Sequence, residues 1–168
     1  KDGTEFLVSL STSAIRNDKG EPIALIGVAS DITGRKRTEI ENQVNYEITQ
    51  GITSTSNLDE LLKIIHKSLG KVVYADNCFV ALHNPKTNLF SFPYWIDKFD
   101  STPLPTSLGK SCTDYVFRNA KPLLLSQKIF DQLVAQKEVE LLGSNSPSWI
   151  GIPLQTPSRV IGVLVLQH

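Results

Sequence analysis

Residues 31–44 read DITGRKRTEIENQV, and this charged segment continues to Thr53. Within it, apolar residues recur at every fourth position: Ile40, Val44, Ile48 and Ile52. That spacing places them along one side of an α-helix, and the stripe winds slowly around the helix instead of keeping a heptad register. We therefore expect a connector helix that packs partly on its own domain and partly on a second copy of itself. The alternative is an amphipathic surface helix with a single partner.

The composition of the 168 residues is that of an ordinary globular protein, with 17 basic and 17 acidic side chains. This balance gives no electrostatic reason to expect nucleic acid or an anionic membrane as a partner. No apolar run approaches the roughly 20 residues of a membrane span, and no signal-peptide pattern is found at the start. The two cysteines, Cys78 and Cys112, form no disulfide framework, which fits a cytoplasmic location. Because the sequence begins without Met and ends inside a strand-like run, residues 163–168, we expect a fragment of a longer protein.

Two strands are predicted before the connector. Residues 4–15 alternate polar and apolar side chains, and residues 23–32 form a second run that follows Pro22. Between them, residues 16–20 (RNDKG) have the composition of a turn. Together these segments predict an antiparallel hairpin, which is marginally stable unless something covers it.

A longer series of elements is predicted after the connector. A helix begins with Asn57 as its N-cap and Glu60 as the reciprocal partner, and a later helix pairs Ser111 with Asp114 in the same way. Strands are predicted over 78–83, 89–96, 122–126, 149–154 and 160–166, with loop over 97–107 and helix over 127–142. This order predicts an α+β fold with helices layered on an antiparallel sheet.

The first 37 residues resemble the C-terminal end of a PAS domain. The segments that carry the resemblance are KDGTEF at 1–6, GEPI at 20–23 and GVASDITGRK at 27–36. The N-terminal half of a PAS domain, with its ligand cavity, has no counterpart in the chain. No PAS cofactor is therefore inferred.

The remainder of the chain resembles a GAF domain. The segments that carry this resemblance are ADNCFVAL at 75–82, LGKSCTDYVFRNAKPLL at 108–124, SWIGIPL at 148–154 and VIGVL at 160–164. The resemblance implies a domain order of a PAS hairpin over 1–33, a connector helix over 34–56 and a GAF domain over 57–168. The last GAF helix is expected to be missing, because the chain stops in the final strand.

No group of residues predicts enzyme catalysis or a metal site. The three histidines, His66, His83 and His168, are scattered, and the glycines form no phosphate-binding loop. A kinase phospho-acceptor histidine is followed by an acidic residue and then Arg-Thr-Pro, whereas Lys67 follows His66. We interpret His66 as a structural side chain and not as a haem or metal ligand.

The GAF resemblance suggests ligand classes that can be compared with the sequence. Cyclic-nucleotide-binding members carry an Asn-Lys…Phe-x-x-x-Asp-Glu pattern that is absent here, and bilin-binding members carry a His after the attachment cysteine where this chain has Thr113. Both cofactors are disfavoured. A redox role for Cys112 is a separate hypothesis, since a helix start and Lys110 would lower the pKa of its thiol while burial would raise it.

An unidentified small molecule is the remaining ligand class. GAF pockets lie between the sheet and its loop-and-helix cover, which suggests Phe92, Tyr94, Cys112, Tyr115 and Trp149 as lining residues. Aromatic rings with a polar tip can stack on a ligand and hydrogen-bond to it, but the same residues could simply fill the core.

We interpret the chain as a sensory fragment of a bacterial signal-transduction protein, with no catalytic activity of its own. The resemblance implies a sensor histidine kinase or diguanylate cyclase as the parent, in a two-component phosphorelay or a related system. The fragment would form a homodimer through the connector helix. The alternatives are a ligand-free GAF spacer that dimerises, or a thiol-based redox sensor or methionine sulfoxide reductase that uses Cys112 together with Cys78.

Overall fold

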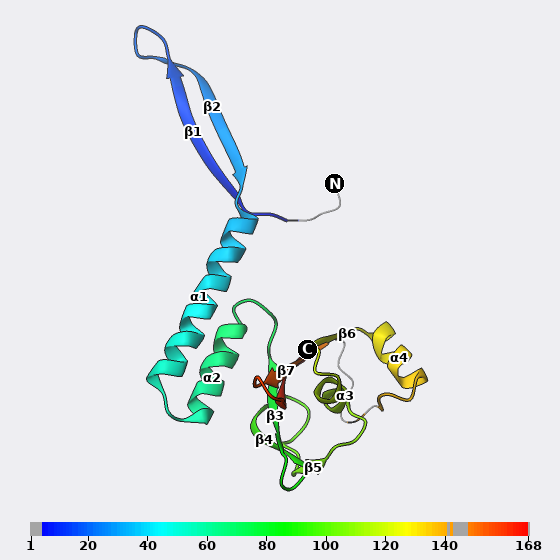
Figure 1. The fold of residues 1–168 in the computed structure, drawn as a ribbon. Helices are drawn as coiled ribbons and strands as arrows, with labels where there is room; N and C mark the ends of the chain where they lie inside the picture. The colour runs from blue at the N-terminus through cyan, green and yellow to red at the C-terminus, as the bar shows by residue number, and fades with distance from the viewer. Residues whose placement is uncertain (1–4, 141, 143–147, 168) are drawn as a thin grey trace. The chain divides into compact units, whose positions relative to one another are not determined.

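The computed structural model describes residues 5–140, 142 and 148–167, and the chain divides into two compact units, Lys1–Tyr46 and Glu47–His168 (Figure 1). The opening Lys1-Asp2-Gly3 of the PAS-like segment lies outside the described residues. No helix in the described part of the chain is both long enough and apolar enough to cross a membrane.

The first unit contains the predicted hairpin. Strands β1 (Val8–Arg16) and β2 (Pro22–Asp31) pair in an antiparallel register, and helix α1 (Thr33–Ser54) begins directly after them. In the turn, the Asn17 side chain accepts hydrogen bonds from the backbone N–H groups of Lys19 and Glu21, both at 3.0 Å. The prediction of a turn over 16–20 and of a helix that starts just past residue 33 is confirmed.

Helix α2 (Leu58–Leu69) opens at the predicted N-cap, but its second capping partner was predicted wrongly. The Asn57 side chain accepts a hydrogen bond from the Asp59 backbone N–H at 2.9 Å. Glu60 does not return to Asn57; its carboxylate accepts a hydrogen bond from the Thr55 hydroxyl at 2.9 Å. The Thr55 side chain lies within reach because the chain reverses between α1 and α2.

The C-terminal part of α1, from Glu47 onward, packs on α2 within the second unit. Gly51 permits this close approach, since a Cβ there would lie 3.0 Å from Cγ2 of Ile64. On the same side, the Glu47 carboxylate accepts hydrogen bonds from the hydroxyl of buried Ser68 at 2.8 Å and from Lys71.

The second unit is built on one antiparallel sheet with the strand order β5-β4-β3-β8-β7-β6. Strands β3 and β8 are central, and the alternating apolar side chains of both are buried on the two faces of the sheet. The elements that follow α2 are β3 (Asn77–Asn84), β4 (Leu89–Ile96), β5 (Thr106–Ser107), α3 (Cys112–Asn119), β6 (Leu123–Leu125), α4 (Gln127–Ala135), β7 (Trp149–Gln155) and β8 (Val160–Gln167).

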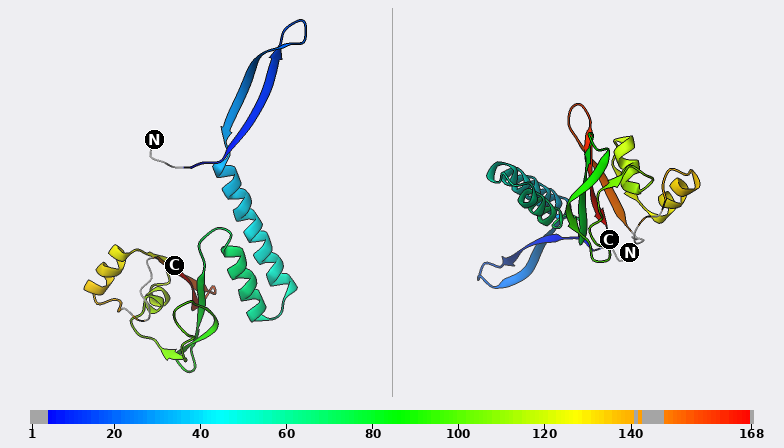
Figure 2. Two further views of the ribbon diagram at one scale, coloured as in Figure 1. Left: turned by 180° about the vertical axis from the view of Figure 1, so that it is seen from behind. Right: turned by 90° about the horizontal axis from the view of Figure 1, so that it is seen from below.

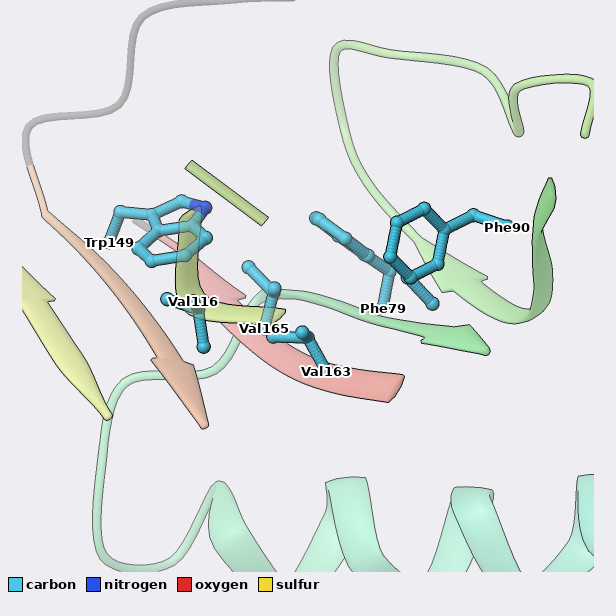
Figure 3. Close-up of a cluster of buried hydrophobic side chains, with 7 residues drawn as sticks. Phe79, Phe90, Val116, Trp149, Val163 and Val165 are labelled. Carbon is cyan, nitrogen blue, oxygen red and sulfur yellow. The ribbon is translucent and has the colours of Figure 1, made fainter. Parts of the chain in front are cut away.

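Helices lie on both faces of this sheet, α2 on one and α3 with α4 on the other (Figure 2). The face toward α3 carries the larger cluster, in which Trp149 lies at one end and Phe79 and Phe90 at the other, with Val163 and Val165 between them (Figure 3). The face toward α2 carries Leu62, Ala75, Cys78, Val80, Tyr94 and Leu166. The predicted α+β class with an antiparallel sheet flanked by helices is confirmed.

Two predicted boundaries in this unit were wrong. The segment 97–107 is not all loop, because Thr106 and Ser107 pair with β4 as β5; two residues are too few for a visible alternation. The helix predicted over 127–142 ends at Ala135, because Lys137 adopts a φ of 59° and the Glu138 N–H closes the helix on the Leu133 carbonyl at 3.0 Å. Leu141, within the predicted helix, lies outside the described residues.

Candidate ligand-binding site

A cavity of about 440 Å³ lies on the α3 side of the sheet. Its floor is formed by side chains of β3, β4 and β7, and its other walls come from the 100–107 segment, the start of α3 and the start of α4. This volume is within the range of roughly 300–1,000 Å³ that small-molecule sites occupy.

Three aromatic rings form a continuous wall of the cavity. Phe79 and Trp95 stack with their ring centroids 4.6 Å apart, and Phe92 meets Trp95 edge-on at 5.5 Å. The indole N–H of Trp95 donates a hydrogen bond to the Asp100 carbonyl at 2.9 Å, which fixes the ring against the 97–107 loop. Phe92 and Trp95 are only partly buried, so the wall offers apolar ring surface to a ligand.

Of the five residues suggested by the sequence, Phe92, Cys112 and Trp149 line this cavity, whereas Tyr94 and Tyr115 do not. Tyr94 is placed on the opposite face by a β-bulge. Val80 pairs with Tyr94 but Leu82 pairs with Ser91, so two residues of β4, 92 and 93, oppose one residue of β3. A regular strand would have put residues 92 and 94 on the same face.

Tyr94 belongs instead to a hydrogen-bonded pair with His66. The Nε2 atom of His66 lies 2.5 Å from the Ala75 carbonyl, which can only accept, so Nε2 carries the proton. In the neutral imidazole, Nδ1 then accepts from the Tyr94 hydroxyl at 2.8 Å. Burial raises the pKa of Tyr94, with a further contribution from Cys78. His66 therefore joins α2 to the sheet, in agreement with the structural role predicted for it.

The start of α3 supplies a polar edge to the cavity. Ser111 and Asp114 form the predicted capping box: the Asp114 backbone N–H donates to Ser111 Oγ at 3.1 Å, and Asp114 Oδ2 accepts from the Ser111 backbone N–H at 2.8 Å. Asp114 is only 5% exposed, yet it lines the cavity and also accepts from the Ser111 hydroxyl at 2.6 Å. The prediction of this capping box is confirmed.

Cys112 lies at the first position of α3 and lines the cavity with its thiol protonated. Burial raises the pKa of Cys112 from 9.0 to about 11, against a smaller lowering by a backbone hydrogen bond, and Asp114 raises it further. The lowering expected from the helix start and Lys110 is therefore outweighed by burial. A protonated thiol is a poor nucleophile.

We expect Cys112 to react with iodoacetamide at pH 8 about 100-fold more slowly than an ordinary thiol, because the rise of the pKa from 9.0 to about 11 lowers the thiolate fraction by that factor. The rate should increase about tenfold per pH unit up to pH 11. The measurement uses a Cys78→Ala variant, so that Cys112 alone reacts, with Cys112→Ser as the blank. Alkylation at the rate of an ordinary thiol would contradict the protonated state.

The two cysteines are separated by the sheet. Cys78 packs with the α2-side cluster and Cys112 with the α3-side cluster, and both are free thiols. Burial raises the pKa of Cys78 to about 12. Side chains on opposite faces of one sheet cannot reach the 3.5–4.5 Å Cβ separation of a disulfide without rearrangement of the strands.

Several lining residues were not predicted from the sequence. Phe79 could have been found, since the alternation of β3 places it on the same face as Ala81 in the buried core. Trp95 was hidden by the bulge in β4. The acidic lining residues Asp100 and Glu140 come from irregular segments, where no periodicity indicates which way a side chain points. In the described ranges, no group of three or more His, Cys, Asp or Glu side chains could hold a metal ion.

Comparisons with known proteins give a family and a fold. The family model described as GAF domain matches residues 57–168. A search of curated proteins gave no match. A search of solved structures found proteins of similar fold.

The GAF domain of a phosphoenolpyruvate-protein phosphotransferase from Coxiella burnetii is 17% identical, with a TM-score of 0.60 over 79% of this chain and 77% of that one. The GAF domain of A. aeolicus nlh2 in an inactive state is 20% identical, with a TM-score of 0.58 over 79% and 81%. Free methionine-R-sulfoxide reductase from Neisseria meningitidis, in complex with its substrate, is 14% identical, with a TM-score of 0.57 over 79% and 74%. At these identities the structures share the fold with this chain.

Proposed function

Because the chain belongs to the GAF domain family, we propose that residues 57–168 form a sensory module that binds a small molecule in the cavity beside α3. The observation that carries this proposal is the cavity itself. Its volume of about 440 Å³, its aromatic wall and its polar edge are the properties of a small-molecule site. A ligand-free spacer has no need of such a space, which side chains could fill with a gain in stability.

A path of direct contacts inside the second unit could carry the state of the cavity to α1. Trp95 lines the cavity, its neighbour Tyr94 points to the other face, and Tyr94 is hydrogen-bonded to His66 of α2. Helix α2 in turn contacts the end of α1 through Ile64 and Gly51. A ligand that favours one packing of α2 would bias α1, with a coupling free energy typically of about 1–3 kcal/mol.

We further propose that the protein acts as a homodimer through α1. Ile40 and Ile52 of the predicted stripe are 42% and 58% exposed, and Tyr46 is exposed as well. Exposed apolar side chains on a helix that is otherwise polar are suited to a second copy of the same helix. Replacement of Ile40 and Ile52 by Glu should convert the dimer to a monomer in light scattering after size exclusion. An unchanged mass would argue against this surface.

For the parent protein we propose a bacterial sensor histidine kinase or diguanylate cyclase, with its output domain outside this chain. The proposal is supported by the PAS-like residues 20–36 ahead of the GAF domain and by helix α1, which continues from one unit into the other. The thiol-based alternatives have less support. The raised pKa of Cys112 and the placement of Cys78 behind the sheet argue against a redox sensor or a two-cysteine reductase.

Native mass spectrometry of the protein as purified tests ligand binding and dimerisation together. We expect a bound small molecule, or a molecule from a metabolite screen that raises the melting temperature. The variant Thr113→Phe, which fills the cavity from α3, should abolish that gain.

The matched control is Ser91→Phe, because Ser91 is exposed on β4 and lies away from the cavity. The Ser91→Phe variant should bind the small molecule as tightly as the unsubstituted protein does. A ligand that binds equally well to the Thr113→Phe variant would overturn the assignment of the cavity, and a screen with no ligand at all would favour the spacer.

A further inference from the structure

We propose that the cavity selects a small organic cation, such as a substituted ammonium ion, over neutral and anionic molecules of the same shape. The inference rests on the proposed function and names the chemical class of its ligand. Two independent features of the lining support it: the sign of its charged side chains and the aromatic character of its wall.

The charged side chains that line the cavity are all acidic. They are Asp100, Asp114 and Glu140, and no Lys or Arg among the described residues joins them. Asp114 is buried, and Glu140 is exposed at the rim. An anion placed among three carboxylates would lose its hydration and meet like charges, whereas a cation would have its lost hydration offset by them.

Two basic side chains beside the start of α3 are already engaged. The Lys110 ammonium lies at the rim, 3.4 Å from the Glu140 carboxylate, with both side chains at least half exposed. The Arg118 guanidinium donates to the backbone carbonyls of Gly109 at 2.6 Å and Glu138 at 3.3 Å. Lys110 therefore offsets part of the negative charge of Glu140 at the rim, whereas Arg118 is held by backbone carbonyls. Neither basic side chain lines the cavity itself.

The starts of α3 and α4 also border the cavity, and each contributes a partial positive charge of about half a unit. At α3, the Asp114 carboxylate accepts from the Ser111 N–H and cancels that charge locally. At α4, Ser126 caps the helix with its hydroxyl. The Lys110 ammonium and the two partial charges together offset about two of the three negative charges, so the field inside the cavity still favours a cation.

The aromatic wall adds an attraction that neutral molecules do not share. Phe79, Phe92 and Trp95 present ring surface to the cavity, and a cation over the face of such a ring is attracted by its π electrons, most strongly when the cation is desolvated. Rings and carboxylates together bind the charged head and the alkyl body of an ammonium ion. A phosphate or carboxylate ligand would gain from neither.

The test compares three probes of nearly the same shape: choline, its neutral isostere 3,3-dimethyl-1-butanol and the anion 3,3-dimethylbutanoate. Binding to the protein is measured by calorimetry and by NMR of the tryptophan indole N–H groups. We expect choline to bind at least about tenfold more tightly than the neutral probe, with the anion weakest, and to lose affinity as the salt concentration rises.

Two variants test whether the preference for choline arises in the cavity. Phe92→Leu should weaken choline binding several-fold while the neutral probe changes little, and Glu140→Gln should reduce the preference for choline. Glu60→Gln, a matched loss of one carboxylate on the α2 face, should leave the preference unchanged.

Equal or tighter binding of the neutral probe would overturn the proposal that the ligand is a cation, and the cavity would remain a ligand site. A lack of binding by all three probes would also overturn the cation class, while the proposed sensory function is decided separately by the native mass spectrometry. Preference for the anion would contradict the conclusion that the acidic lining favours a cation.

Discussion

Replacement of Trp149 by alanine is expected to lower the free energy of unfolding by about 3–5 kcal/mol, the usual cost of removing a large buried aromatic side chain. The Trp149 indole is 7% exposed and is a member of the α3-side core cluster. It also covers Gly151 of the same strand: a Cβ at Gly151 would lie 2.7 Å from its Cζ3 atom. Loss of the ring would leave a void that these rigid strands cannot close.

The measurement is urea denaturation followed by far-UV circular dichroism. Leu124→Ala is the matched control, because Leu124 lies on the neighbouring strand β6 and is 65% exposed. It should change the free energy of unfolding by no more than about 0.5 kcal/mol. A loss below about 1 kcal/mol for Trp149→Ala would show that the indole does not support the core.

Replacement of Gly162 by alanine is expected to destabilise the domain by about 1–3 kcal/mol through overpacking. A Cβ at this position would collide with the backbone carbonyl of Ala81 and lie 2.8 Å from Cδ2 of Leu82. Gly162 lies opposite Leu82 in the pairing of β8 with β3, the central strands of the sheet, so the backbone cannot shift without loss of ladder hydrogen bonds.

Gly70→Ala serves as the control for this substitution. Gly70 has helical dihedrals, with φ of −60°, and its nearest neighbours would lie 3.5 Å or more from a new Cβ. Alanine there should leave the free energy of unfolding unchanged or raise it by up to about 1 kcal/mol. Thermal and urea denaturation of both variants would test the pair. Similar stabilities for the two would contradict the close approach at Gly162.

The sequence was sufficient for the elements whose side chains follow a regular period. The stripe of α1, the capping box of Ser111 and Asp114, and the short apolar runs of β3 and β8 are local patterns, and each corresponds to an observed element. The end of α4 was missed because Lys137 takes a left-handed conformation, which neighbouring contacts impose on a residue that does not favour it.

The candidate site was predicted less completely. Phe92, Cys112 and Trp149 were placed on the cavity because the GAF resemblance implies a pocket between the sheet and its loop-and-helix cover. Tyr94 was placed there wrongly, because one extra residue in β4 moves the side chains that follow it to the opposite face of the sheet. A bulge depends on the pairing of two strands, and the sequence of one strand does not reveal it.

The placement of Trp95 and Trp149 gives the domain a built-in optical reporter. They are the two tryptophans of the chain, and both border the same hollow. A molecule that enters should therefore alter the intrinsic emission of the protein without any dye or label. Two variants that each keep a single tryptophan, Trp95 in one and Trp149 in the other, would show which of the two indoles changes its emission when a ligand binds in the cavity.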